Sequence, residues 1–413
     1  MPGYNKISLK EAQDILMDEF LVPMGEIETR IKRFQKKLQD NNLDGMLIVQ
    51  RVDLFYFSGT AQNGFLYVPA EGEPVLFIKK YLPRAQKESS IKEIIEIKSM
   101  KEIPKFLMDF YGRLPETLGL EFDVLPVSDF NFYKTVFPIK NYTDGSGLIL
   151  ETRMIKSPWE IEQMEKTAEI SGKTFEYMKT AIRPGLTEIE FAGIAETFAR
   201  RLGHGSYLNV RNYQAKAYYW HILSGKNGGM VGFLDAPASG AGTGPAFPSG
   251  AGNKSLYAGE PIMIDIGTVL NGYHLDETRM FAIGHMPEKA MKACRASIEI
   301  HDTVLEKSRP GVTVSELFDI SMSKARALGY GDQYLGPEDY RVTFIGHGIG
   351  IELVEHPIIA KGRDYVLEPG MTFSLEPKMV FENEFSAGIE SVFLVTETGH
   401  RMISKVPADI FIC

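Results

Sequence analysis

The stretch PIMIDIGTVLNGYHLDETRMFAIG, residues 261–284, consists of two β-rich runs on either side of Asn271-Gly272. An Asn-Gly pair between two such runs is a strong signal for a β-hairpin with a two-residue turn. A turn centred on this pair places Leu270 opposite Tyr273, and the pairing then continues outward in both strands. The stretch therefore predicts a long antiparallel hairpin.

This register brings two carboxylates together. Asp265 lies opposite Thr278, and Asp276 shares the face of Thr278, so the two aspartates are diagonal neighbours on one face of the hairpin. Carboxylates this close on a buried face repel one another, so they need cations, or one of them must hold a proton. The hairpin thus predicts a metal site, and the alternative is a surface-facing pair of aspartates near a turn.

Three later stretches add candidate ligands. FIGHGIGIELVEHP places His347 in a glycine-rich run, where backbone can approach a site closely. MTFSLEPKMVF and GIESVFLVTETG each contain one glutamate, Glu376 and Glu390, in an otherwise apolar run. A charged side chain inside an apolar strand is rarely buried unless it is paired or bound to a metal.

Separate structural roles are the alternative explanation: salt bridges to Arg279 or Lys378 for the glutamates, and an ordinary core position for the histidine. One binuclear site accounts for all of these polar intrusions at once. Its expected ligands are Asp265, Asp276, His347, Glu376 and Glu390.

Composition excludes some other functions. The 413 residues carry a formal net charge of −9, which argues against nucleic acid as a main partner, because phosphate binding needs a basic face. Cys294 and Cys413 are the only cysteines, so a disulfide framework is not expected and a cytoplasmic location is. The sequence shows neither a signal peptide nor an apolar run of membrane-spanning length, and we expect no membrane partner.

The chain divides into two expected domains, residues 1–155 and 156–413. The first alternates helical and strand-like patterns, as α/β domains do. Its expected helices are 10–20, 25–41 and 101–112, and its expected strands include 45–50, 53–59, 64–69 and 73–79.

The second expected domain begins with two helices. Ser157 and Thr187 are their predicted N-caps, and Pro158 and Glu160 stand at the first and third helical positions of the first. Further helices are expected near 286–308 and 313–328, among many strands.

Residues 223–255 form a segment rich in glycine, alanine and serine. A segment of this length in a compact domain is usually functional or disordered, and a flexible surface insertion is the plainer alternative. We expect it to reshape a substrate pocket or to act as a lid.

These motifs resemble the pita-bread metallopeptidase family, which includes methionine aminopeptidase, aminopeptidase P, prolidase and creatinase. The resemblance rests on the hairpin and on shorter motifs, and it extends upstream through RMIKSPWEIEQMEKTAEIS and RPGLTEIEF. It implies a creatinase/prolidase-like α/β N-terminal domain followed by an α+β pita-bread catalytic domain. The shorter motifs are His347-Gly348-x-Gly350, Glu355-x-Pro357, Glu368-Pro369-Gly370-Met371, Glu376-Pro377 and Glu390 before FLVTETG.

The resemblance also implies roles for the ligands. Asp265 would chelate one of two divalent ions, Asp276 and Glu390 would bridge both, and His347 and Glu376 would complete the set of ligands around the second ion. Manganese, iron, cobalt and zinc all suit such a set. Glu376 would also be the general base that takes a proton from the attacking water. A homodimer is expected on the same ground.

Three positions depart from the family pattern around the substrate. Pro248 or Ser249 stands where related peptidases carry a histidine, Val354 where they carry a second histidine, and Gly388 where prolidase-like enzymes carry an arginine. Those side chains hold the substrate carbonyl and stabilise the oxyanion. Three other residues are candidates to replace them as substrate-binding or, for the first, catalytic groups: His356, His221 and Tyr219.

The functional expectation is a binuclear metallohydrolase of the Xaa-Pro aminopeptidase or dipeptidase type, acting on a small peptide or amide. The altered substrate positions keep a second class open, a non-peptidase metalloenzyme such as a creatinase-like C–N hydrolase or a lyase. A non-catalytic binding module is the third class, and a complete ligand set argues against it.

Overall fold

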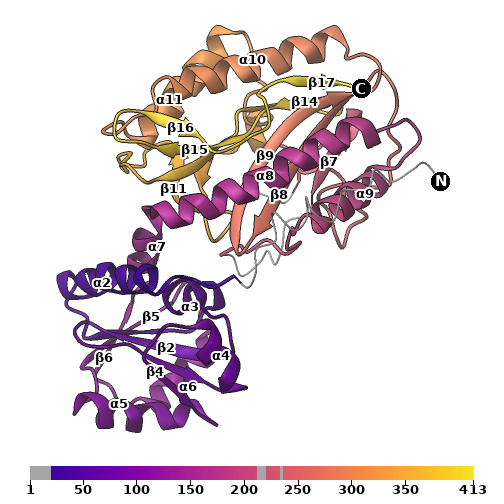
Figure 1. The fold of residues 1–413 in the computed structure, drawn as a ribbon. Helices are drawn as coiled ribbons and strands as arrows, with labels where there is room; N and C mark the ends of the chain where they lie inside the picture. Colours follow the sequence, from indigo (N-terminus) through magenta and orange to yellow (C-terminus); the bar gives the residue numbers. More distant parts are fainter. Residues whose placement is uncertain (1–19, 212–219, 233–235) are drawn as a thin grey trace. The chain divides into compact units, whose positions relative to one another are not determined.

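A computed structural model describes residues 20–211, 220–232 and 236–413 (Figure 1). These residues form two compact units, an N-terminal unit of residues 20–153 with Arg211 and a C-terminal unit made of the remainder. The expected helix at 10–20 falls almost wholly outside the described residues. Within the described ranges, every helix is too short or too polar to cross a membrane.

The N-terminal unit is built on one mixed sheet with the strand order β4-β3-β2-β1-β5-β6. β1 and β2 pair antiparallel, as do β2 and β3, whereas the outer neighbours pair parallel. Mixed sheets of this kind need helical crossovers, which the α/β alternation supplies. The strands are β1 (Gly45–Ile48), β2 (Gly64–Pro69), β3 (Val75–Ile78), β4 (Glu93–Glu96), β5 (Thr117–Leu120) and β6 (Asn141–Asp144).

The helices of this unit follow the apolar patterns of the sequence. In α2, the side chains of Ile27, Ile31, Phe34 and Leu38 are buried on one face, as their helical spacing predicts. The helices are α2 (Met24–Asp40), α3 (Arg51–Ser58), α4 (Leu82–Glu88), α5 (Ile103–Tyr111), α6 (Val127–Val136) and α7 (Ser146–Met154), with a 3₁₀ turn at Met100–Glu102.

The expected strand at 53–59 is wrong, because this segment is helix α3. The Gln50 side chain accepts a hydrogen bond from the backbone N–H of Asp53 and caps the helix at its start. Gly59, with a φ of 80°, ends the helix in the left-handed conformation that glycine adopts readily. A short apolar run cannot distinguish a buried strand from a buried helix, and here the caps decide.

The C-terminal unit is α+β, with three sheets. Their orders are β11-β10-β12-β15-β16, β13-β14 and β17-β9-β8-β7. The strands are β7 (His221–Ser224), β8 (Pro261–Leu270), β9 (Tyr273–Ala282), β10 (Phe344–Gly348), β11 (Glu355–Ala360), β12 (Thr372–Leu375), β13 (Lys378–Phe381), β14 (Phe385–Gly388), β15 (Ser391–Val395), β16 (His400–Met402) and β17 (Ile410–Ile412).

Four long helices cover these sheets (Figure 1): α8 lies along β8 and β9, α9 packs on β7, α10 on β14 and α11 on β11. Ser157 and Thr187 cap α8 and α9 through the predicted capping boxes, and Thr313 caps α11 in the same way. The helices are α8 (Pro158–Ala181), α9 (Glu188–Arg201), α10 (Glu288–Leu305) and α11 (Val314–Ala327), with 3₁₀ turns at Gly225–Asn227 and Glu338–Tyr340.

β8 and β9 form the predicted hairpin in the predicted register. Leu270 pairs with Tyr273, and the pairing runs without a bulge to Pro261 and Ala282. The turn residue Asn271 has a φ of 55° and Gly272 a φ of 85°, the two left-handed conformations that a type I′ turn requires.

Candidate metal centre

The hairpin places the two aspartates as the register predicts. Asp265 pairs with Thr278, and Asp276 pairs with Gly267 in the facing strand. Asp276 is 8% exposed, and all ten residues of β9 are buried. The alternative of a surface-facing aspartate pair is therefore wrong.

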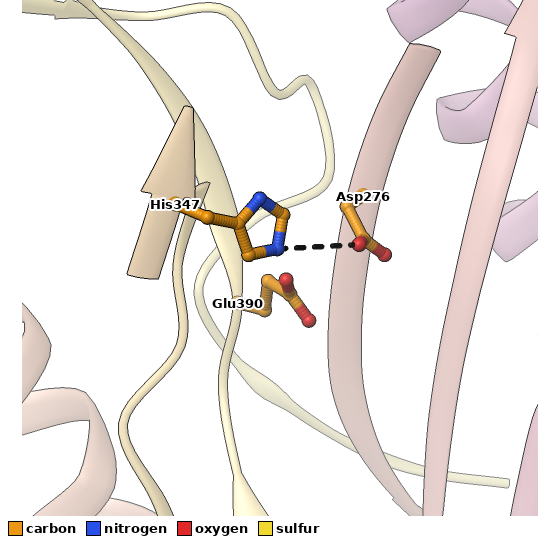
Figure 2. Close-up of side chains that lie close together, drawn as sticks. All are labelled: Asp276, His347 and Glu390. Carbon is orange, nitrogen blue, oxygen red and sulfur yellow. Dashed lines mark ion pairs between the residues drawn. The ribbon is translucent and has the colours of Figure 1, made fainter. Parts of the chain in front are cut away.

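Three of the five expected ligands come together around one point. Asp276 from β9, His347 from β10 and Glu390, which lies between β14 and β15, each offer one ligand atom within 4.8 Å of the others. Figure 2 shows the imidazole of His347 pointing at the carboxylate of Asp276, with the carboxylate of Glu390 beside them. All three residues are buried.

The imidazole of His347 is oriented by its own neighbourhood. Its Nδ1 lies 2.9 Å from the carbonyl oxygen of Gly348, so this nitrogen carries the proton and donates it. The lone pair is then on Nε2, which faces Asp276 Oδ2 at 3.9 Å and Glu376 Oε1 at 3.6 Å. A neutral imidazole in this tautomer presents the atom that a metal ion needs.

Two hydroxyl groups hold the carboxylate of Glu390. Thr278 Oγ1 and Ser374 Oγ donate to its two oxygens, each at 2.8 Å. The backbones of Thr278 and Glu390 also exchange hydrogen bonds in an isolated bridge. Glu390 is thus fixed against β9 by both its main chain and its side chain.

The ammonium of Lys378 is a sixth member of the cluster. Nζ lies 3.0 Å from Asp265 Oδ2, 2.9 Å from Glu376 Oε2 and 3.0 Å from Glu390 Oε2, and the side chain is 4% exposed. From the sequence, Lys378 is expected only as a possible salt-bridge partner of Glu376 and Glu390. Its position two residues after Glu376 is a usable signal, since alternate residues of extended chain share a face.

The two salt-bridge alternatives have different outcomes. Lys378 pairs with both glutamates, as that alternative predicts. The guanidinium of Arg279 instead donates to backbone carbonyls, including that of Glu390, and to the hydroxyl of Ser391. These bonds of Arg279 therefore hold the chain around Glu390 rather than its carboxylate.

The carboxylates of the cluster have different proton affinities. Burial raises the pKa of Asp276 well above its ordinary value, and the charges of Glu390 and Asp265 raise it further. Burial raises the pKa of Glu390 to about 7, against the attraction of Lys378. Burial alone would also raise the pKa of Asp265, but Lys378 and His221 together hold it below its ordinary value. Asp276 and Glu390 are thus the members short of positive charge.

The residues fit one divalent ion well. Asp276, His347 and Glu390 offer two carboxylates and an imidazole, a mixed donor set that suits Mn²⁺, Fe²⁺, Co²⁺ and Zn²⁺. Asp265 and Glu376 lie outside this group of three, and one oxygen of each contacts the ammonium of Lys378.

The three candidate substrate residues have separate positions. His221 lies on β7 next to Asp265, with Nδ1 3.8 Å from Asp265 Oδ2. His356 lies on β11, where the centroid of its ring is 5.6 Å from that of Tyr365. It is not part of the group formed by Asp276, His347 and Glu390. Tyr219 falls outside the described residues. Substrate roles for all three stay predictions.

Gly388 lies opposite Lys378 in the β13–β14 pair. A Cβ at this position would come within 2.5 Å of Lys378 Cγ. The absence of a side chain at residue 388 therefore makes room for the lysine stem beside the cluster.

The glycine-rich segment is attached to helix α9. The carboxylate of Glu188 accepts hydrogen bonds from the backbone N–H and hydroxyl of Ser224, from Asn227 Nδ2 and from the backbone N–H of Gly252. One buried carboxylate thus holds both ends of the segment 223–255.

Comparison with known proteins gives the family. The family "Metallopeptidase family M24" matches residues 162–397, and "Creatinase/Prolidase N-terminal domain" matches residues 30–155. The chain is 28% identical over 386 residues to the "Xaa-Pro dipeptidase" of Pyrococcus furiosus, a match that covers 93% of this chain and 100% of that protein. It is 25% identical over 389 residues to the enzyme of the same name from Pyrococcus horikoshii, with 94% and 100% covered.

Solved structures show the same fold. An Xaa-Pro dipeptidase from Bacillus anthracis superposes with a TM-score of 0.80 at 24% identity, covering 94% of this chain and 100% of that one. A prolidase from Pyrococcus furiosus superposes with a TM-score of 0.74 at 26% identity, covering 90% and 99%. The predicted fold and the prediction of a metallohydrolase are both confirmed. The chain belongs to metallopeptidase family M24, with a creatinase/prolidase N-terminal domain ahead of its catalytic domain.

Proposed function

We propose that this protein is a metal-dependent hydrolase of the Xaa-Pro dipeptidase type, which cleaves the amide bond of a small peptide. The observation that carries the proposal is the convergence of Asp276, His347 and Glu390 in a chain that matches Xaa-Pro dipeptidases over their full length. When bound, the divalent ion would act as a Lewis acid that polarises the substrate carbonyl and lowers the pKa of the attacking water.

The chain's own residues supply the rest of the chemistry. Asp276 and Glu390 provide negative charge for the ion, and Thr278 and Ser374 keep Glu390 in place. Glu376 is the proposed general base: its Oε1 lies 3.6 Å from His347 Nε2, so this carboxylate borders the proposed ion site, where it would take the proton released by the attacking water.

We also propose roles for the other expected site residues, together with domain limits, a location and an oligomeric state. Asp265 and Glu376 belong to the functional site with the other three residues, and His221, His356 and Tyr219 are candidate substrate contacts. The domain limits at 155 and 156, a cytoplasmic location and a homodimer are proposed on the family resemblance.

A second candidate is a creatinase-like hydrolase of a non-peptide C–N bond. It is favoured by Val354 and Gly388, which offer no hydrogen-bond donor from their side chains at positions where related peptidases have one. Loss of a single oxyanion donor typically costs about 10²–10³ in rate, so a peptide substrate would need other donors.

A substrate panel tests the proposal. Purified full-length protein is supplied with Mn²⁺ or Co²⁺ and assayed on Xaa-Pro dipeptides, on longer Xaa-Pro peptides and on creatine. Turnover of the dipeptides supports the proposal, and turnover of creatine alone supports the second candidate.

A variant pair ties any activity to the site. Asp276→Ala is expected to lose both bound metal and activity, whereas Asp319→Ala, an exposed aspartate on α11, is expected to retain both. An Asp276→Ala protein with full metal content and full turnover would refute the site.

A further inference from the structure

We propose that the ammonium of Lys378 takes the place of one of the two expected metal ions, so that the site binds a single divalent ion between Asp276, His347 and Glu390. This inference rests on the proposed function for the existence of a metal site, and it adds the number of ions that the site holds.

The ammonium of Lys378 lies where a metal ion would be coordinated. Its three donors have three carboxylate partners within 3.0 Å, from Asp265, Glu376 and Glu390. Each of these residues is an expected metal ligand. An ion coordinated by the same oxygens would have to occupy the space that Nζ already fills.

The contacts of the cluster fall into two groups. The ion pairs of Lys378 involve Asp265, Glu376 and Glu390, whereas His347 Nε2 lies 3.9 Å from Asp276 Oδ2 and 3.6 Å from Glu376 Oε1. Glu390 serves both halves, since it also belongs to the group that offers ligand atoms to an ion. The cluster thus consists of a lysine half and a metal half that meet at two carboxylates, Glu390 and Glu376, the latter with Oε2 on Lys378 and Oε1 facing His347.

The net charge of the cluster also favours a single ion. When all four carboxylates are ionised, they and the one ammonium leave an excess of three negative charges in a site that is buried except for Asp265, whose side chain is 16% exposed. One dication reduces this excess to a single charge, whereas a second would make the net charge of these side chains and ions positive. Buried charge without compensation is costly, so the lysine favours one ion over two.

The neighbouring strand makes room for the side chain of Lys378. Lys378 pairs with Gly388 across β13 and β14, and a Cβ at residue 388 would approach Lys378 Cγ to 2.5 Å. The lysine stem therefore lies in space that exists because residue 388 has no side chain. An ammonium on a stem packed in this way is a fixed part of the site rather than a surface charge that folds in.

Metal stoichiometry tests the inference. Full-length protein is saturated with Mn²⁺ or Zn²⁺, desalted and analysed for metal per chain by mass spectrometry, with calorimetric titration as a second count. We expect one ion per chain for the natural sequence. Two ions per chain would overturn the inference. Because the measurement uses the natural sequence, it does not depend on whether a variant folds.

Two variants identify the cause. Lys378→Ala is expected to raise the stoichiometry from one ion to two, because it frees the oxygens of Asp265 and Glu376. Lys156→Ala is the matched control, since Lys156 is also a buried lysine, paired to Glu355 at 3.0 Å, and is expected to leave the count at one. A count that stays at one in folded Lys378→Ala would overturn the inference.

The outcome is distinguishable from failure of the proposed function. Two ions together with Xaa-Pro dipeptidase activity refute the single-ion inference and leave the function standing. No bound ion in saturated natural protein refutes the metal-dependent function and the inference with it. One ion per chain without dipeptidase activity supports the single-ion inference and refutes the proposal that Xaa-Pro dipeptides are the substrate.

Discussion

The hydroxyl of Thr278 donates to the carboxylate of Glu390 at 2.8 Å, although the two residues are 112 positions apart in the chain. Their backbones also form a bridge, so the side-chain bond is made between two segments that are already joined. The metal half of the cluster depends on this link, because Thr278 orients the carboxylate that Lys378 and the ion share.

Thr278→Val is expected to weaken that link while keeping the backbone bridge and the shape of the side chain. A hydrogen bond to a charged group contributes about 1.5–3 kcal/mol, so at a pH well above about 7, where Glu390 is ionised, the metal-free protein should lose about that much free energy of unfolding in urea. Thr372→Val removes a neutral bond to the carbonyl of Ile349 and is expected to cost about 0.5–1.5 kcal/mol. Equal losses in the two variants would contradict a charged Glu390 partner.

The raised pKa of Glu390 predicts a pH dependence in the metal-free protein. Because this pKa is about 7 in the folded state, against an ordinary value of 4.5, the folded state binds the proton more tightly than the unfolded chain does. The stabilisation is fully present below pH 4.5 and is lost as the pH rises to about 7. At 1.36 kcal/mol per pKa unit, this loss is on the order of 3 kcal/mol.

Glu390→Gln removes the titrating group and checks the sign. The metal-free variant is expected to be more stable than metal-free natural protein at about pH 8, with little or no advantage below the ordinary pKa of a glutamate. Urea unfolding at several pH values in the presence of a chelator measures this difference. A natural protein that gains stability relative to the variant as the pH rises toward neutrality would contradict the prediction.

Gly388→Ala is expected to push Lys378 out of its place, because the new Cβ would lie 2.5 Å from Lys378 Cγ. Overpacking of this kind typically costs about 1–3 kcal/mol of folding stability, measured by thermal or urea unfolding. Gly193→Ala is the control, since Gly193 is exposed on α9 with no heavy atom within 4 Å of a built Cβ. That change should stabilise by about 0.5–1 kcal/mol.

Glu188→Gln is expected to loosen both ends of the glycine-rich segment. The amide NH₂ of glutamine would face donors, so some of the donors around Glu188 lose their acceptor, at about 1–3 kcal/mol for each unsatisfied group. We expect increased protease cleavage within residues 223–255 and a lower melting temperature. Glu190→Gln, on the same helix but exposed, keeps the capping box and should change neither.

The hairpin could be predicted residue by residue because its turn fixes its register. Once Asn271 and Gly272 occupy a type I′ turn, every pair outward from Leu270 and Tyr273 follows, and Asp265 and Asp276 fall on one face. The helix caps at Ser157 and Thr187 were predictable for a similar reason, since a capping box is a local interaction.

Helix α3 and the direction of the Lys378 side chain could not be predicted from the local sequence. The apolar run of α3 fits a strand as well as a helix, and only the capping by Gln50 and the left-handed Gly59 decide between them. The direction of the Lys378 side chain depends on its packing against Gly388 and on three carboxylates that tertiary structure brings together. A local pattern therefore cannot choose between a salt bridge and a metal site.

The uninterrupted pairing of β8 with β9 has a consequence for length as well as for composition. Inserting or deleting a single residue within either strand between Asp265 and the turn, or between the turn and Asp276, would rotate one aspartate to the opposite face of the sheet. No substitution elsewhere would restore it. The separation of the two aspartates along the chain is thus as much a part of the site as their carboxylates, and viable length changes in this region should add or remove residues in pairs.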